Sequence, residues 1–168
     1  MIKQFRKSLL LIIAVLVLAA CSDSGEEKQK SASDAVQAAF KSKPKDANNS
    51  YKDIDYYLPF GVEVEKESPN NIILKNGKKT YILFYNQHEQ KDSEVVYQST
   101  VKQRPEWDFE DTYKNDGKFG YMLMKKADND AYELVVGIGG VKLTTETKSL
   151  QSDAAAMMEI AKSVKFKK

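Results

Sequence analysis

The central part of the chain alternates apolar and polar residues and is interrupted by short turn sequences. The alternation begins at Val62-Glu63-Val64-Glu65, and a period of two places successive side chains on opposite faces of a strand. Asn76-Gly77 separates the apolar segments 72–74 and 80–85, and this dipeptide is a strong signal for a tight β-hairpin. The sequence therefore predicts strands joined by short turns, which pair as an antiparallel sheet.

Further strands are predicted at 94–101, 119–124, 132–138 and 141–147. Asp128-Asn129-Asp130 predicts a longer hairpin turn, and Gly139-Gly140 predicts a break or bulge in the sheet.

A helix is predicted on each side of these strands. The first begins at Asp34, which acts as its cap, and places Val36 and Phe40 on one face. The second begins at Ser152 or Asp153 and continues to Val164 with helical spacing of its apolar residues. The expected fold class is α+β: a single antiparallel sheet of about six to seven strands with an N-terminal and a C-terminal helix.

The N-terminus has the pattern of a secretory signal. Three basic residues within 1–7 precede the run Leu9–Ala20, which is apolar throughout. At 1.5 Å per residue this run spans roughly 18 Å, whereas a bilayer core is about 30 Å thick. The run is therefore predicted to be a signal peptide (residues 1–20) and not a transmembrane helix.

The signal ends in Leu18-Ala19-Ala20-Cys21, which resembles the lipobox of bacterial lipoproteins. The resemblance implies cleavage between Ala20 and Cys21 and attachment of a diacylglycerol to the Cys21 sulfur. It also implies a location on the outer face of the cell membrane, held by that lipid. Cys21 is the only cysteine, so no disulfide is expected and the folded domain depends on its core.

Residues 21–31 are predicted to be the lipidated cysteine and a disordered tether, because Ser22 to Ser31 contains no apolar residue. Such a tether has a root-mean-square reach of about 17 Å. The globular domain is predicted to be residues 32–168. Its closing stretch, 153–166, resembles the terminal helix of small membrane lipoproteins of Bacillus-type bacteria and, more distantly, of PsbP/Mog1-like α+β envelope domains.

Cleavage of the signal also changes the charge. The whole chain has 26 basic and 24 acidic residues, for a formal net charge of +2. The signal contains three of the basic residues, Lys3, Arg6 and Lys7, so 23 basic residues then face 24 acidic ones. A net charge near −1 gives no field that attracts nucleic acid, and no nucleic-acid partner is expected.

No catalytic constellation is recognisable in the sequence. His88 is the only histidine and lies in a polar segment, where we expect an exposed loop residue. No Gly-x-Ser-x-Gly nucleophile elbow or zinc-ligand spacing is present. No cofactor or metal is therefore predicted.

Two aromatic segments are candidate contact sites. In Glu106-Trp107-Asp108-Phe109-Glu110-Asp111, Trp107, Asp108 and Glu110 are candidates for contacting a ligand or partner. The simpler interpretation is that Trp107 and Phe109 are core anchors and that the acids face water.

Tyr56 and Tyr57 are the candidates in the second segment, 51–60, where aromatic side chains can line a groove. The simpler interpretation is that Ile54, Tyr57 and Phe60 pin this segment across the sheet, with Tyr56 partly exposed.

The functional hypothesis is a non-catalytic, lipid-anchored binding or accessory module that contacts an envelope protein or wall polymer. One alternative is a carboxylate-dependent cell-wall hydrolase that uses Asp108, Glu110 and Asp111. The other is a carrier of a lipid or another apolar ligand.

Overall fold

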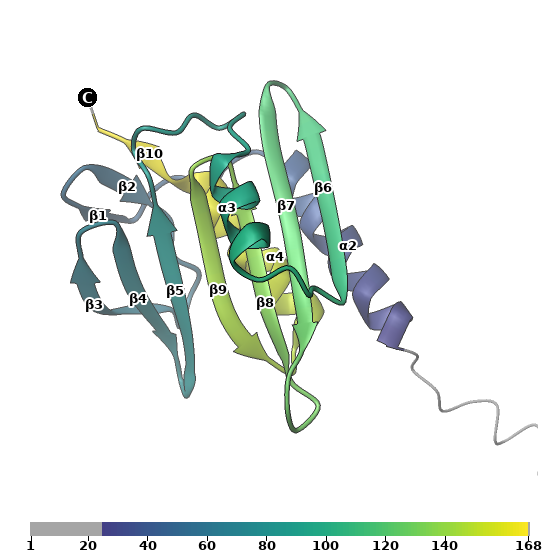
Figure 1. Ribbon diagram of the computed structural model, residues 1–168. Coiled ribbons are helices and arrows are strands. Elements are labelled where there is room, and N and C mark those ends of the chain that lie inside the picture. Colours follow the sequence, from purple (N-terminus) through teal and green to yellow (C-terminus); the bar gives the residue numbers. More distant parts are fainter. Residues whose placement is uncertain (1–24, 168) are drawn as a thin grey trace, which may run out of the picture.

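The computed structural model describes residues 25–167 and shows an α+β domain with two sheets (Figure 1). The larger sheet has seven antiparallel strands in the order β3-β4-β5-β9-β8-β7-β6. Their bounds are β3 (Glu63–Ser68), β4 (Asn71–Asn76), β5 (Lys79–Tyr85), β6 (Phe109–Asn115), β7 (Lys118–Lys126), β8 (Tyr132–Ile138) and β9 (Val141–Thr147). The predicted class and strand number are thus confirmed for this sheet.

The prediction of a single sheet is wrong. A second, three-stranded sheet has the order β1-β2-β10, with β1 at Asn49–Tyr51, β2 at Ile54–Tyr56 and β10 at Lys165–Phe166. These strands are two or three residues long, so a period of two cannot be recognised in them. The second sheet brings the C-terminus back beside the segment that follows the first helix (Figure 1).

The predicted hairpin at Asn76-Gly77 is confirmed. Asn76 pairs with Lys79, so Gly77 and Lys78 form the two-residue connection between β4 and β5. Gly77 has φ +60°, which glycine adopts without steric cost.

The predicted turn at 128–130 also joins two paired strands, β7 and β8. The pair Gly139-Gly140 behaves differently from the prediction, because it neither breaks nor bulges the sheet. Ile138 pairs with Val141, so the two glycines form the tight turn of the β8–β9 hairpin.

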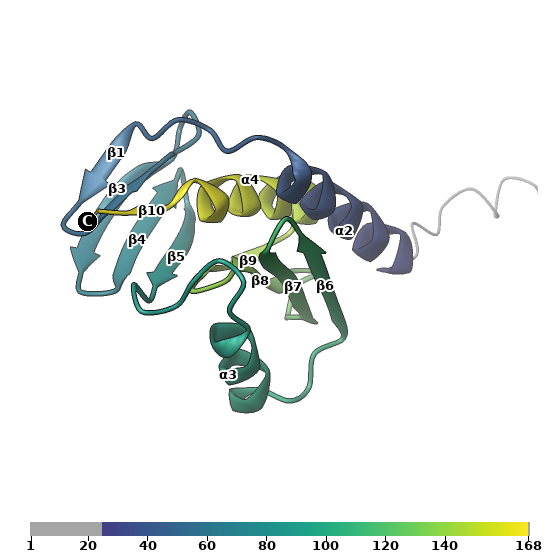
Figure 2. The ribbon, with the colours of Figure 1, turned by 90° about the horizontal axis from the view of Figure 1, so that it is seen from above.

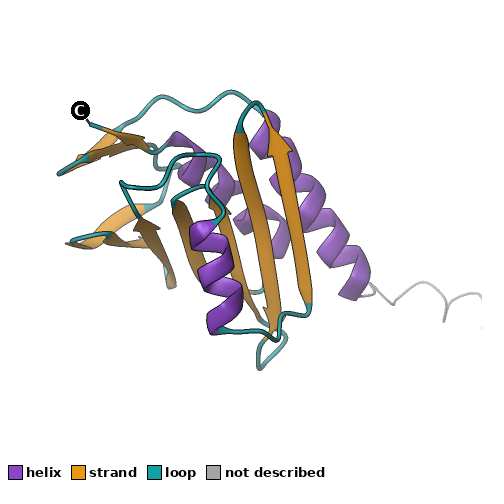
Figure 3. Cartoon of the chain, turned by 45° about the horizontal axis from the view of Figure 1, so that its top comes forward, coloured by secondary structure: helices purple, strands orange, loops and turns teal. Residues whose placement is uncertain are grey.

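Helices lie on both faces of the larger sheet (Figures 2 and 3). Helix α2 (Gly25–Lys41) and helix α4 (Leu150–Ser163) pack against each other and against one face, where the main hydrophobic core lies. Helix α3 (Val95–Gln103) lies on the other face. It covers a second group of buried side chains, which we call the α3-side cluster: Phe119, Tyr121, Leu123 and Val135.

Helix α3 corrects the prediction of a strand at 94–101. Its valines, threonine and tyrosine favour strands by composition, but such preferences are overridden by packing. Val96 and Thr100 are buried and are four residues apart, which is the spacing of a helix face. Tyr97 and Val101 continue that face onto the α3-side cluster.

Helix α2 corrects the predicted tether. Residues 25–31 are helical, and Asp34 lies within the helix and does not cap it. The expected apolar face is present, since Val36 and Phe40 are buried. The polar residue Ser33 is buried as well, because its hydroxyl donates to the Asp111 carboxylate at 2.5 Å and lies 3.0 Å from the Tyr113 hydroxyl on β6. This polar attachment to β6 is not visible in an apolar pattern.

The segment between β2 and β3 is arranged opposite to the prediction. Tyr56 is fully buried and Phe60 is fully exposed, whereas Phe60 was expected in the core and Tyr56 partly outside it. Among the helices of residues 25–167, none combines the length and apolarity needed to cross a membrane.

Candidate functional site

The acids of the segment 106–111 are divided between the two faces of the sheet. Glu110 pairs with Leu123 of the α3-side cluster and accepts a hydrogen bond from the Tyr97 hydroxyl. Asp111 pairs with Met122 of the main core and accepts the hydrogen bond from Ser33 on α2. The carboxylates proposed for hydrolysis therefore do not face a common substrate position.

Asp108 has a structural partner of its own. Its Oδ2 atom accepts the backbone N–H of Lys126 at 2.6 Å, and its own N–H donates to the Met124 carbonyl at 3.0 Å. Asp108 thus holds the start of β6 against the end of β7.

Trp107 and Phe109 are both packed, as the simpler interpretation expected, but on different clusters. Trp107 packs against the α3-side cluster and Phe109 against the main core. The indole Nε1 of Trp107 is buried and has no hydrogen-bond partner among the described residues. Such an orphan donor is uncommon in a folded protein.

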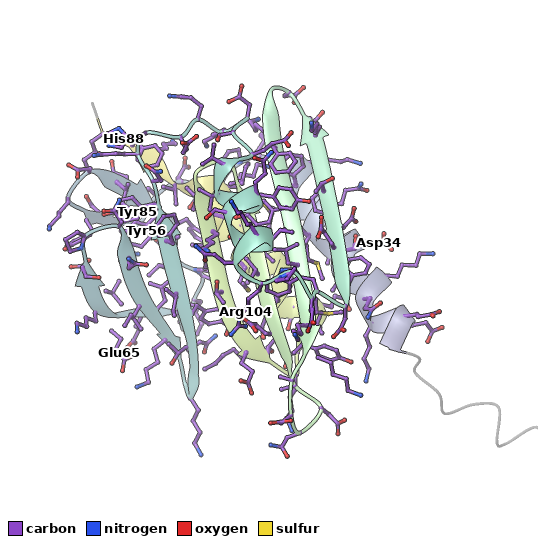
Figure 4. All side chains as sticks on the ribbon, viewed as in Figure 1. Asp34, Tyr56, Glu65, Tyr85, His88 and Arg104 are labelled. Carbon is purple, nitrogen blue, oxygen red and sulfur yellow. The ribbon has the colours of Figure 1, made fainter. Side chains whose placement is uncertain are left out.

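The two candidate tyrosines lie in the smaller sheet and just after it, away from β6 (Figure 4). Burial raises the pKa of Tyr56 to about 12, and its hydroxyl has no partner among the described residues. In this position its ring is not available to a surface ligand. Tyr57 is half-buried, and its backbone N–H donates to Ser163 Oγ at 2.9 Å. The structure therefore does not join the tyrosines and the segment 106–111 into one site.

The most open cavity beside the segment 106–111 is a groove of about 750 Å³. We call it the charged groove. It is formed by the end of α3 and the connection after it, the end of β7, the β7–β8 turn, and one residue each of β8 and β9. These residues are Gln103, Arg104, Pro105, Glu106, Lys125, Lys126, Ala127, Asp128, Asn129, Glu133 and Glu146.

Charges of both signs alternate in the charged groove. Arg104 forms an ion pair with Glu133, and Lys125 Nζ lies 3.6 Å from a carboxylate oxygen of Glu106. Glu133 lies directly opposite Glu146 in the β8–β9 pairing, so two acids are neighbours on one face. Like charges in this position repel, and Arg104 offsets that repulsion. A ligand that fits this surface presents polar groups of both signs.

The sheet face beside α3 is a second open surface. Helix α3 covers β7, β8 and β9 and leaves β3, β4 and β5 uncovered on this side (Figures 1 and 2). Ile82 is 45% exposed there, and its cross-strand neighbours Ile73 and Thr144 are half-buried. A single exposed isoleucine makes a small apolar patch, so this face carries less binding information than the charged groove.

Metal and histidine chemistry have no assembled site in residues 25–167. No three His, Cys, Asp or Glu side chains within that range are grouped closely enough to hold a metal ion. His88 is exposed in the loop after β5, as predicted. Ala20 and Cys21, the predicted cleavage and lipidation positions, lie outside the described residues.

Sequence reasoning missed most of the charged groove. Arg104 was overlooked because the segment before it was interpreted as a strand. Glu133 and Glu146 become neighbours only when Gly139-Gly140 is treated as a turn, and that reading gives their pairing directly.

The chain was also compared with known proteins. No family model, no curated protein and no solved structure matches it.

Proposed function

We propose that the protein is a lipid-anchored lipoprotein of the outer face of the cell membrane, and that it is a non-catalytic module that binds another envelope protein through the charged groove. The observation that carries the proposal is Leu18-Ala19-Ala20-Cys21 at the end of a short apolar run, followed by a folded domain with an open polar groove.

The anchor has a clear physical basis. Each buried methylene contributes about 0.8 kcal/mol of membrane affinity, so a diacylglycerol, with two acyl chains, holds a protein far more durably than one chain.

The charged groove supports a polar partner. Protein surfaces offer both signs of charge on neighbouring side chains, and complementary placement of charges gives specificity. The groove contains Arg104, a residue type that is enriched in binding interfaces. The open shape and charged lining do not resemble an apolar pocket for a lipid.

The anchor is tested with Cys21→Ala and with globomycin, an inhibitor of the lipoprotein signal peptidase. We expect unprocessed precursor to accumulate in both cases. Normal maturation in both would contradict the lipobox.

The groove is tested in intact cells with a photo-crosslinking amino acid at Gln103, which lines it. Gln98 is the matched control, because it is also an exposed glutamine on α3 but does not line the groove. We expect an adduct of one discrete mass from position 103 only, weakened by Arg104→Glu and unchanged by Lys102→Glu. No adduct, or the same adducts from both positions, would contradict a protein-binding groove.

A further inference from the structure

The inference begins with the chain length between the predicted lipid and the first helix, and it rests on the proposed anchor. Cys21 is separated from Gly25, where α2 already runs, by Ser22, Asp23 and Ser24. Four peptide steps span at most about 14 Å when fully extended. A diacylglycerol on Cys21 therefore keeps the first turn of α2 close to the bilayer surface.

The first turns of α2 lie beside the beginning of α4. Glu27, Lys28 and Ser31 of α2 line a cavity together with residues 148–152. The bilayer that receives the lipid is therefore close to the β9–α4 connection as well, at the lower end of the molecule in Figure 1.

The beginning of α4 is tied in turn to the β4–β5 hairpin. Asp153, in the first turn of α4, forms an ion pair with Lys79. Lys79 pairs with Asn76 across the hairpin turn, and a Cβ on Gly61 would lie 3.6 Å from Asn76 Oδ1. The turn that contains Gly61 thus belongs to the same end of the molecule as the beginning of α2.

Phe60 stands on this turn with its whole side chain in water, at 105% relative exposure. The turn is closed by a hydrogen bond of 3.1 Å from the Val62 N–H to the Pro59 carbonyl. Gly61 has φ +82°, which fits the third position of a type II turn. A rigid turn that presents a phenylalanine fully to solvent is unfavourable unless another apolar phase receives the ring.

We infer that the end of the molecule formed by the start of α2, the start of α4, the β4–β5 turn and the Phe60 turn faces the lipid bilayer, and that Phe60 inserts into the boundary between headgroups and acyl chains. The lipid on Cys21 supplies the affinity, and Phe60 sets the orientation. The loop with His88 then points away from the membrane, because β5 separates it from the β4–β5 turn (Figure 4).

The test uses the full lipidated protein in vesicles of phosphatidylethanolamine and phosphatidylglycerol that contain lipids brominated near the headgroup. Wild-type protein gives the emission of Trp107, the only tryptophan. Phe60→Trp adds a second emitter that keeps an aromatic ring at this position. His88→Trp is the matched control, because His88 is also exposed in a loop but at the opposite end.

We expect the emission added by Phe60→Trp to lose at least half of its intensity in brominated vesicles and to shift to shorter wavelength. The emission added by His88→Trp should change by less than a tenth. Equal quenching of the two additions, or none, would overturn the orientation.

The mass of the N-terminal peptide from the same samples separates this inference from the proposed anchor. A peptide without diacylglycerol contradicts the anchor and the orientation together. A lipidated protein in which the Phe60→Trp emission is not quenched leaves the anchor intact and overturns the orientation.

Discussion

The ammonium nitrogen of Lys162 lies 2.7 Å from the carbonyl oxygen of Phe40 and 3.1 Å from that of Ala39. Lys162 belongs to the last turn of α4, is 3% exposed, and donates to carbonyls at the end of α2. The last carbonyls of a helix have no partner within it, and a cation there also interacts favourably with the helix dipole. One side chain therefore closes α2 and joins the two helices of the main core.

Lys162→Met keeps the aliphatic stem and removes the donor. We expect the free energy of unfolding to fall by about 1–3 kcal/mol, because two carbonyls lose their buried partner. Chemical denaturation measures the change. Lys102→Met, at an exposed position on α3, is the control and should shift stability by about 0.5 kcal/mol or less. An equal effect of both variants would contradict the role of Lys162.

Asp153 is the centre of a second buried polar group. Its carboxylate accepts hydrogen bonds from Tyr81, Thr147 and Lys79. Asp153→Ala leaves these donors without their partner, so we expect a loss of about 2–4 kcal/mol of unfolding free energy. Asp46→Ala, in the exposed loop after α2, is the control and should be close to neutral. If the two variants unfold at the same denaturant concentration, the network contributes nothing to stability.

Gly137 is the position at which the ring of Tyr121 approaches the backbone of β8. A Cβ there would lie 2.3 Å from Tyr121 Cζ, which is closer than atoms tolerate. We expect Gly137→Ala to lower the thermal midpoint through about 1–3 kcal/mol of overpacking. Adding Tyr121→Leu should recover part of the loss, and strictly additive effects of the two changes would contradict the steric explanation. Gly25→Ala, with open space around it, should leave the midpoint unchanged or raise it slightly.

Asp55 on β2 is predicted to titrate below its usual range. A hydrogen bond from Ser50 and the positive charges of Lys167 and Lys165 lower the pKa of its carboxyl from 3.8. The unfolded chain binds this proton at higher pH than the folded one. The contribution of Asp55 to stability is therefore present above pH 3.8 and is lost as the pH falls through the folded-state pKa.

An NMR titration of the Asp55 carboxyl carbon measures this midpoint directly. Ser50→Ala should raise it more than Lys167→Gln does, because the Ser50 hydrogen bond is the largest cause of the lowered pKa. A midpoint at or above 3.8 in the wild type would contradict the arrangement of β1, β2 and β10.

The sequence predicted the elements in which local signals and packing agree. The hairpin at Asn76-Gly77 and the C-terminal helix have both strong local preference and an apolar face, and both are present. Helix α3 was missed because its valines favour a strand locally, and only the buried rings of Phe119 and Tyr121 beneath it favour the helix.

The site was less predictable than the fold. Which face an acid occupies depends on register, and Asp111 and Glu110 lie on opposite faces although they are adjacent in sequence. The exposure of Phe60 follows from a turn of four residues, and the composition of that segment favours burial. The charged groove combines residues from α3 to β9, which become neighbours only in the folded sheet.

The most direct measurement of the central claim is the mass of the N-terminal peptide of the protein isolated from its native membranes. The account predicts a peptide that begins at Cys21 and carries a diacylglycerol on the sulfur. A peptide that retains residues 1–20, or one that begins at Cys21 with a free thiol, would contradict it.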